Sequence, residues 1–251
     1  NIKIQSGDLE PMRGHTPIAA DLKTGTIRSI YKYNSTWFSF TSANVSLIAS
    51  PVAQDQYDRV YYTGDGVPKV TSNLIATGVG PDPQAAYELG VPAPDTGPVF
   101  ISLNGADPDP EDFSNDETRF YLVTYVTGYG EEGPPSPVSS AIAVNDPTQT
   151  VTLELPIPVS NTQNITSKRL YRTLTGASDT DFYLVAEYPL ATVQVTDSVD
   201  GAALGLALET EDYLPPDPNM QGLVLGPNGI AAGFAGNEVF FSEPFLPYAY
   251  P

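Results

Sequence analysis

Hydrophobic and polar residues alternate over short stretches of this chain, and most of these stretches end at Gly, Pro, Asn or Asp. Runs of about four to eight residues that are rich in Val, Ile, Thr, Tyr and Phe are typical of β-strands. Residues 27–40 (IRSIYKYNSTWFSF) predict two strands with a turn at Asn34-Ser35, and further strands are predicted at residues 45–48 and 59–63. Residues 1–80 are therefore predicted to form a β meander.

A proline-rich segment follows. Residues 81–96 contain Pro81, Pro83, Pro92 and Pro94, which is typical of a linker. We expect at most a helical turn there, at residues 85–89. A domain boundary is predicted in this segment.

A second block of strands occupies residues 97–200. Its short, turn-separated apolar runs are typical of a β-sandwich. The predicted strands lie at residues 99–103, 120–127, 150–155, 168–173, 182–188 and 192–196.

Beyond the sandwich, residues 201–220 are predicted to be an irregular, exposed linker that is rich in proline near its end. Residues 221–251 then contain a hairpin, GIAAGFAGNEVFF, with its turn at Gly236-Asn237. This hairpin shares with residues 27–40 the order of apolar strand, Asn-containing turn and aromatic strand. We therefore predict an all-β chain in which the sandwich is inserted into a host β domain whose strands lie on both sides of it.

Composition narrows the function classes. The 251 residues include 30 Asp and Glu and 11 Lys and Arg, which gives a net charge of −19. The electrostatic field of a protein this acidic repels nucleic acid and anionic membranes. An acidic wall could still let a polyanion slide past without adhering. The absence of cysteine excludes disulfides, thiol nucleophiles and Cys-ligated metals. No apolar run is long enough for a membrane span.

Catalytic chemistry has few candidates in this sequence. The single histidine, His15, lies near the N-terminus, where a catalytic triad is not expected. Prolines stiffen the one acidic stretch with alternating carboxylates, which disfavours a calcium loop. No phosphate-binding loop is found, and we expect no enzyme activity, no cofactor and no metal. The clustered carboxylates are predicted to be solvated loop residues: Asp107, Asp109, Glu111 and Asp112; Glu131 and Glu132; Glu209, Glu211 and Asp212.

Two sets of residues are candidates for surface recognition. Asn34, Asn44 and Asn164 begin Asn-X-Ser/Thr sequons, which matter only in a secreted eukaryotic protein. An aromatic group on residues 31–40 could line a sugar-binding face or form a core, and we favour the core. Its members are Tyr31, Tyr33, Trp37, Phe38 and Phe40.

Two resemblances extend this interpretation. Residues 121–139 (YLVTYVTGYGEEGPPSPVS) resemble the strand-and-loop signature of fibronectin type III and related immunoglobulin-like modules, although the strand comes early in the block rather than late. Residues 168–251, together with RVYYTGDGVPKVT at 59–71, resemble virion structural proteins of tailed bacteriophages. This second resemblance implies a tail nozzle or tail tubular protein of a short-tailed phage. It also implies propeller-like β segments interrupted by an Ig-like insertion.

The function expected from this resemblance is structural. Copies of the chain would form a ring in the virion tail, as a homo-oligomer around the path of DNA ejection, and would dock adaptor and fibre proteins, while DNA passes without specific contacts. The start at Asn1 suggests a piece of a longer or processed polypeptide. The alternative is a bacterial surface adhesin or carbohydrate-binding module with Ig-like domains. The residues expected at interfaces are Tyr129, Pro134, Pro135, Phe241, Pro244, Phe245, Pro247 and Tyr248.

Overall fold

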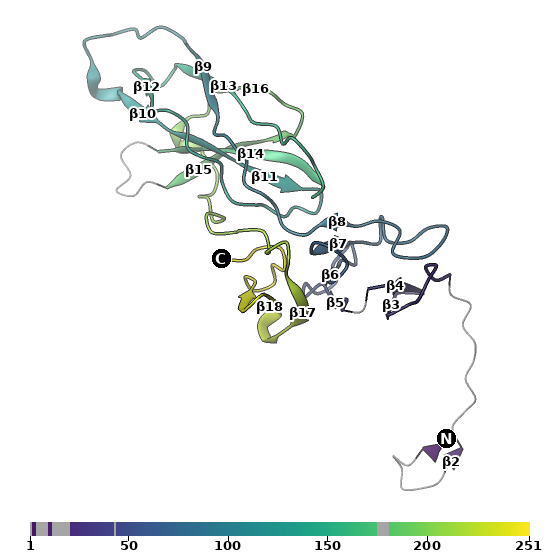
Figure 1. The fold of residues 1–251 in the computed structure, drawn as a ribbon. Helices are drawn as coiled ribbons and strands as arrows, with labels where there is room; N and C mark the ends of the chain where they lie inside the picture. Colours follow the sequence, from purple (N-terminus) through teal and green to yellow (C-terminus); the bar gives the residue numbers. More distant parts are fainter. Residues whose placement is uncertain (1, 4–9, 12–20, 43, 175–180) are drawn as a thin grey trace.

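A computed structural model describes residues 2–3, 10–11, 21–42, 44–174 and 181–251. The chain is all-β, as predicted: within those residues the regular elements are strands and three short 3-10 turns. Figure 1 shows a group of sandwich-like strands from the middle of the sequence and a group of smaller sheets from its two ends. A short pair, β1 (Ile2–Lys3) and β2 (Glu10–Pro11), precedes both groups.

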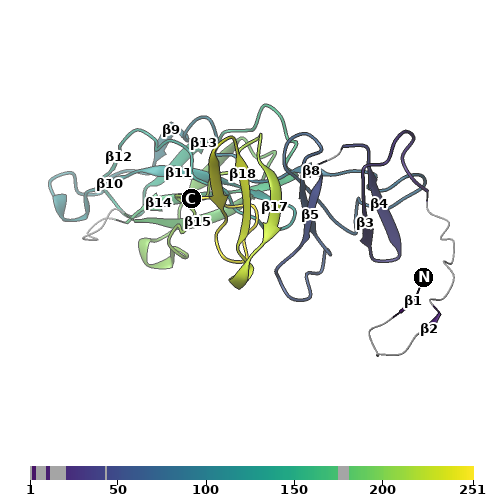
Figure 2. The ribbon, with the colours of Figure 1, turned by 60° about the horizontal axis from the view of Figure 1, so that its bottom comes forward.

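Three small antiparallel sheets come from the two ends of the chain, and Figure 2 shows them one after another. The first is a hairpin, the second has four strands and the third has three. The hairpin consists of β3 (Ser29–Tyr33) and β4 (Thr36–Phe40). The four-stranded sheet consists of β5 (Ser46–Ala49), β6 (Val60–Thr63), β7 (Lys69–Thr71) and β8 (Tyr87–Glu88). The last consists of β17 (Gln221–Leu225), β18 (Ala231–Ala235) and β19 (Glu238–Phe241).

Strand β6 joins these sheets because both of its faces are buried. Side chains alternate across a strand, so neighbouring residues face opposite layers. Val60 and Tyr62 pack into one apolar cluster with the aromatic residues of the β3–β4 hairpin. Tyr61 packs into a second cluster, which contains Met220 and Leu223 from the far end of the sequence. The two ends of the chain therefore share one core, and β17 lies against β5 and β6.

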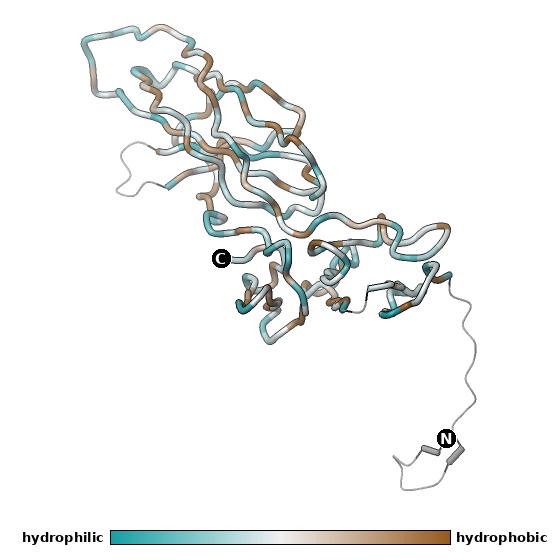
Figure 3. The backbone as a smooth tube through the Cα atoms, viewed as in Figure 1, coloured by the Kyte–Doolittle hydropathy of each residue, from teal (hydrophilic) through white to brown (hydrophobic). Residues whose placement is uncertain are grey.

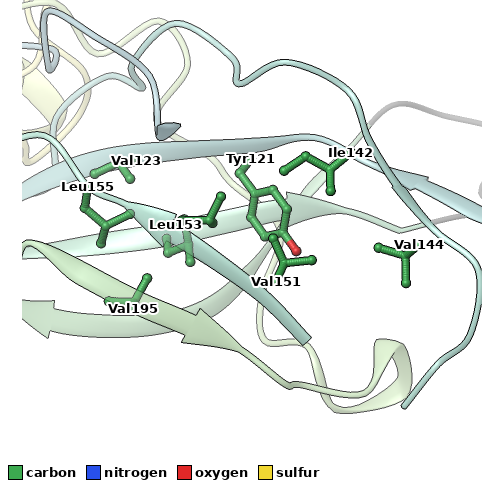
Figure 4. Packing of buried hydrophobic residues seen from close by; sticks show 9 residues of the cluster. Tyr121, Val123, Ile142, Val144, Val151, Leu153, Leu155 and Val195 are labelled. Carbon is green, nitrogen blue, oxygen red and sulfur yellow. The ribbon is translucent and has the colours of Figure 1, made fainter. Parts of the chain in front are cut away.

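The middle of the chain forms two three-stranded antiparallel sheets, in the orders β9-β13-β16 and β11-β14-β15, with a short β10–β12 pair beside them. Their inner side chains form one buried cluster, which Figure 4 shows between the sheets. The strands are β9 (Val99–Asn104), β10 (Glu117–Arg119), β11 (Tyr121–Thr127), β12 (Ile142–Val144), β13 (Thr150–Glu154), β14 (Ile165–Thr173), β15 (Phe182–Pro189) and β16 (Gln194–Asp197).

Several sequence predictions match these elements closely. Both predicted hairpins form, and Asn34 adopts the positive φ that its turn requires. The helical turn expected at residues 85–89 is wrong, because Tyr87 and Glu88 pair with β7 as β8. Leu89 then enters the shared core. Burial of these side chains outweighs the local helix propensity of the Ala-Ala-Tyr-Glu-Leu stretch.

The chain leaves the stacked sheets after β8 and returns to them at β17, and its outgoing and returning segments touch. Gly90 has a φ of +97°, and a Cβ atom built on it would lie 2.6 Å from Cβ of Pro215. Only glycine fits this crossing without moving the neighbouring chain. Thr210, on the returning segment, donates a hydrogen bond to the carbonyl of Gly133 in the sandwich.

We expect Gly90→Ala to lower the free energy of unfolding by about 2–5 kcal/mol, because it combines a left-handed backbone penalty with a clash. Gly236→Ala is the matched control: Gly236 also has a positive φ (+60°), but no atom lies within 4 Å of its added Cβ. This control should lose only about 1–2 kcal/mol. Urea denaturation of both variants measures the difference, and equal losses would show that the crossing is not tightly packed.

Candidate functional site

The loop between residues 127 and 133, which follows β11, fastens the sandwich to the stacked sheets. Tyr129 at its tip lies 5.0 Å from Tyr57 and 6.3 Å from Tyr87, measured between ring centroids. Its hydroxyl donates a hydrogen bond to Oγ of Ser72 at 2.9 Å. The guanidinium of Arg59 lies 5.7 Å from the centre of the same ring. An aromatic side chain of the insertion is thus held by four residues of the host.

Glu131 forms a buried ion pair across this junction. Its side chain accepts a hydrogen bond from Nη1 of Arg59 at 2.7 Å. Arg59 is also bound by Asp55, through Nε at 2.7 Å. Glu131 is only 4% exposed. A buried charge that loses its partner is costly, so this pair resists separation of the sandwich from the host.

Burial raises the pKa of Glu131 from its ordinary value of 4.5 to about 6, against the opposing effect of Arg59. The carboxyl group of Glu131 therefore titrates closer to neutrality than an ordinary glutamate does. Because its folded-state pKa is raised, the folded protein binds this proton more tightly than the unfolded chain does.

Glu132, the next residue, contacts the sandwich instead. Its two carboxylate oxygens accept hydrogen bonds from Tyr171 at 2.7 Å, Thr124 at 2.5 Å and Arg169 at 2.5 Å. Arg169 is bound by Glu187 as well, at 2.9 Å. Consecutive carboxylates thus bind opposite partners, one in the host and one in the insertion.

A cleft of about 380 Å³ opens next to Glu132. Charged, aromatic and aliphatic side chains surround it. They come from the outer face of β14 and β15, from residues 206–213 on the segment that returns to the stacked sheets, and from Leu246 and Tyr248 near the C-terminus. The residues that give it chemical character are Glu132, Arg169, Tyr171, Glu209, Tyr213 and Tyr248.

A second buried polar network closes one end of the sandwich. Asp197 is fully buried and accepts a hydrogen bond from the hydroxyl of Tyr121 at 2.8 Å. Arg172 and Arg119 lie 3.4 and 3.9 Å from the same carboxylate. Glu117 contacts both guanidinium groups. The network contains two carboxylates and two guanidinium groups, so its charges are balanced. We interpret it as a structural network that holds this end of the sandwich together.

The residues expected at interfaces separate into two groups. Five of them lie partly or fully within the chain's own packing. Tyr129 sits at the junction described above, and Tyr248 packs beside two of the apolar clusters. The others in this group are Pro134, which is buried, Pro135, which is half-buried, and Pro247, which is buried. These side chains hold the sandwich, the returning segment and the C-terminal run together.

The other group is accessible. Phe241, Pro244 and Phe245 are exposed. Phe245 adopts a positive φ of 63° and donates its backbone N–H to Gly229. Its ring is therefore held at the surface by an ordered backbone turn.

The three predicted carboxylate clusters differ in how far they are buried. The loop with Asp109, Glu111 and Asp112 is exposed, and Figure 3 shows it coloured mainly as hydrophilic. Glu209, Glu211 and Asp212 are also exposed. The prediction of solvated loop acidity is wrong for Glu131 and Glu132, because both are buried and paired. Across the described part of the chain, no group of three His, Cys, Asp or Glu side chains could hold a metal ion.

The aromatic candidates and the histidine lie in different parts of the chain. Tyr33, Phe38 and Phe40 are buried in the cluster next to β6, which confirms the core interpretation for them. Trp37 is half-buried and lies opposite Lys32 in the hairpin. His15 lies outside the described residues. Within the part that is described, no helix is long and apolar enough to cross a membrane.

Sequence comparison adds no identity to this geometry. No protein-family model and no curated protein matches the chain.

The raised pKa of Glu131 predicts a pH effect on stability. Its contribution to the free energy of unfolding is greatest below pH 4.5 and is lost as the pH rises to about 6, a fall of about 2 kcal/mol. We expect the difference in stability between the wild type and Glu131→Gln to change by this amount over that window. Urea titrations of both proteins between pH 4 and 7 measure it, and a constant difference would contradict the burial argument.

The contacts of Tyr129 predict a graded pair of variants. Tyr129→Phe removes only the hydrogen bond to Ser72 and should cost about 1 kcal/mol of stability. Tyr129→Ala also removes the ring contacts with the host and should cost about 2–4 kcal/mol. Chemical denaturation compares them. If both variants lose the same amount, the ring contributes nothing to the junction.

Proposed function

We propose that this chain is a structural component of the tail of a bacteriophage, of the nozzle or tail tubular kind, rather than an enzyme. The observation that carries the proposal is the buried fastening of an inserted sandwich onto a stack of sheets. Arg59 and Glu131 pair across the junction at 2.7 Å, and Tyr129 inserts between host side chains. These buried contacts would hold the two groups of sheets in one relative orientation. A fixed orientation suits a protein that must keep its shape within an assembly.

The strand arrangement supports an Ig-like assignment for the insertion. Two three-stranded sheets face each other across one core, and residues 132–139 extend one of them through hydrogen bonds to β11. The strand with the fibronectin-like signature pairs with β14, and the two strands between them in sequence, β12 and β13, belong to other sheets. The stacked sheets on both sides of the insertion are likewise what blades of a propeller-like host would provide.

The charge of the chain supports a passage that does not retain DNA. A net charge of −19 repels phosphates, so a ring of such chains would guide duplex DNA without binding it. Localisation to the virion tail and docking of adaptor or fibre proteins follow from the same proposal.

A second candidate function, a surface adhesin or carbohydrate-binding module, is favoured by one feature. The cleft beside Glu132 combines three tyrosines with Arg169 and two carboxylates. Aromatic rings and charged hydrogen-bonding groups are the side chains that contact sugars. Glycan-array binding that disappears in Tyr213→Ala, with folding unchanged, would favour this candidate.

Two measurements test the structural proposal. We expect negative-stain electron microscopy of the purified protein at high concentration to show closed rings with an opening wide enough for duplex DNA. We also expect mass spectrometry to detect the chain in purified phage particles from lysates of the organism that encodes it. The absence of its peptides from such particles would overturn the virion assignment.

A further inference from the structure

One face of the β17–β19 sheet is apolar and uncovered. The register places Val224, Ala232 and Phe241 side by side, and pairs Phe234 with Val239 on the same face. We call Val224, Phe234, Val239 and Phe241 the end face; these side chains are 48–62% exposed. The opposite face contributes Leu223 and Ala231 to the shared core. An isolated apolar residue at a surface is ordinary, whereas four on one sheet face indicate a contact.

A second uncovered apolar strand lies in the sandwich. β9 is the last strand of its sheet, and within the described residues it pairs with β13 alone. Its consecutive residues Val99, Phe100 and Ile101 are 43–56% exposed. We call these three residues the β9 edge.

Several other sheet edges are covered by neighbouring segments of the chain. Residues 132–139 hydrogen-bond along β11, and Leu206 and Leu208 bond to β15. Ser39 of β4 donates to the carbonyl of Asp82. β3 and β16 also end their sheets, and they expose polar side chains such as Lys32 and Thr196, although β3 exposes Ile30 as well. Among the described residues, the end face and the β9 edge have no such covering segment and combine several exposed apolar side chains.

Charge distinguishes the same two surfaces. Residues 218–237 and 96–106 contain no charged residue, although the chain carries 30 carboxylates. Two copies with a net charge of −19 repel each other wherever carboxylates would meet. A contact between copies is least opposed where both surfaces are uncharged. The seven residues of the end face and the β9 edge are themselves uncharged, and the carboxylates nearest to them in the strands and the chain are Glu238 in β19, Glu243 after it, and Glu154 of β13, which pairs with Val99.

We propose that copies of this chain join head to tail, with the end face of one copy against the β9 edge of the next. The two surfaces differ from each other, so the contact is heterologous and repeats from copy to copy, which closes into a ring when the rotation allows. This inference rests on the assembly role proposed above and names the surfaces that would produce it.

The test uses two double variants and a control, each of which adds two carboxylates. Val239→Asp/Phe241→Asp changes the end face, and Val99→Asp/Ile101→Asp changes the β9 edge. The control, Val79→Asp/Val159→Asp, changes two almost fully exposed residues outside both surfaces. Analytical ultracentrifugation over a range of concentrations measures the association of each. We expect the wild type and the control to form oligomers larger than dimers, and each surface variant to associate at least about tenfold more weakly.

Mixing the two surface variants gives the decisive result. Each retains one intact surface, and the two intact surfaces are complementary, so an equimolar mixture should form a dimer of one copy of each variant and nothing larger. A wild type that remains monomeric, a β9-edge variant that assembles normally, or a mixture without dimers would each overturn the proposal. Circular dichroism confirms folding, and a variant that unfolds is replaced by the corresponding pair of Lys substitutions.

Failure of the head-to-tail contact can be distinguished from failure of the proposed virion function. Peptides of this chain in purified phage particles, combined with unchanged association of both surface variants, would keep the virion role and overturn the head-to-tail contact. Loss of association in both variants without any such peptides would do the reverse.

Discussion

The burial of both faces of β6 is the constraint on which the rest of the structure depends. Val60 and Tyr62 on one side and Tyr61 on the other leave no solvent-facing surface on this strand, so a sheet must pack on each side of it. One of those sheets comes from the preceding hairpin. The other, which supplies Met220 and Leu223, is available only because the chain returns after the sandwich. The insertion is thus compatible with the host because its two ends lie close together, at Gly90 and Pro215.

The junction between the two groups of sheets combines apolar contacts with buried ion pairs. Glu131 and Glu132 are adjacent in sequence, yet one binds Arg59 in the host and the other binds Arg169 in the sandwich. Buried ion pairs contribute little net stability compared with apolar packing, but a misaligned pair is strongly unfavourable. This pair of carboxylates therefore fixes the orientation of the loop more than it adds to the stability of the fold.

Much of the strand content was predictable because it depends on local signals. The turns at Asn34 and at Gly236-Asn237 identified both hairpins, and apolar runs located the main sandwich strands. β8 was missed because its residues resemble a helical turn until Leu89 is known to be buried. The partners of Glu131 and Glu132 could not be predicted, since Arg59 lies 72 residues away and Arg169 lies 37 residues away. A Gly-Glu-Glu-Gly stretch contains no local sign that its charges are neutralised.

The shared core of the stacked sheets also has a consequence during synthesis. Roughly 130 residues separate Leu89 from Met220, so at about 5–20 residues per second the ribosome needs on the order of ten seconds to supply the second half of this cluster. Over that interval Tyr61 and Val70 of the nascent host lack these partners, while the strands of the sandwich, at residues 99–197, are all synthesised. The inserted module would then bring the emerging C-terminal strands back to the waiting sheet, in the manner of a folded spacer rather than a long flexible loop.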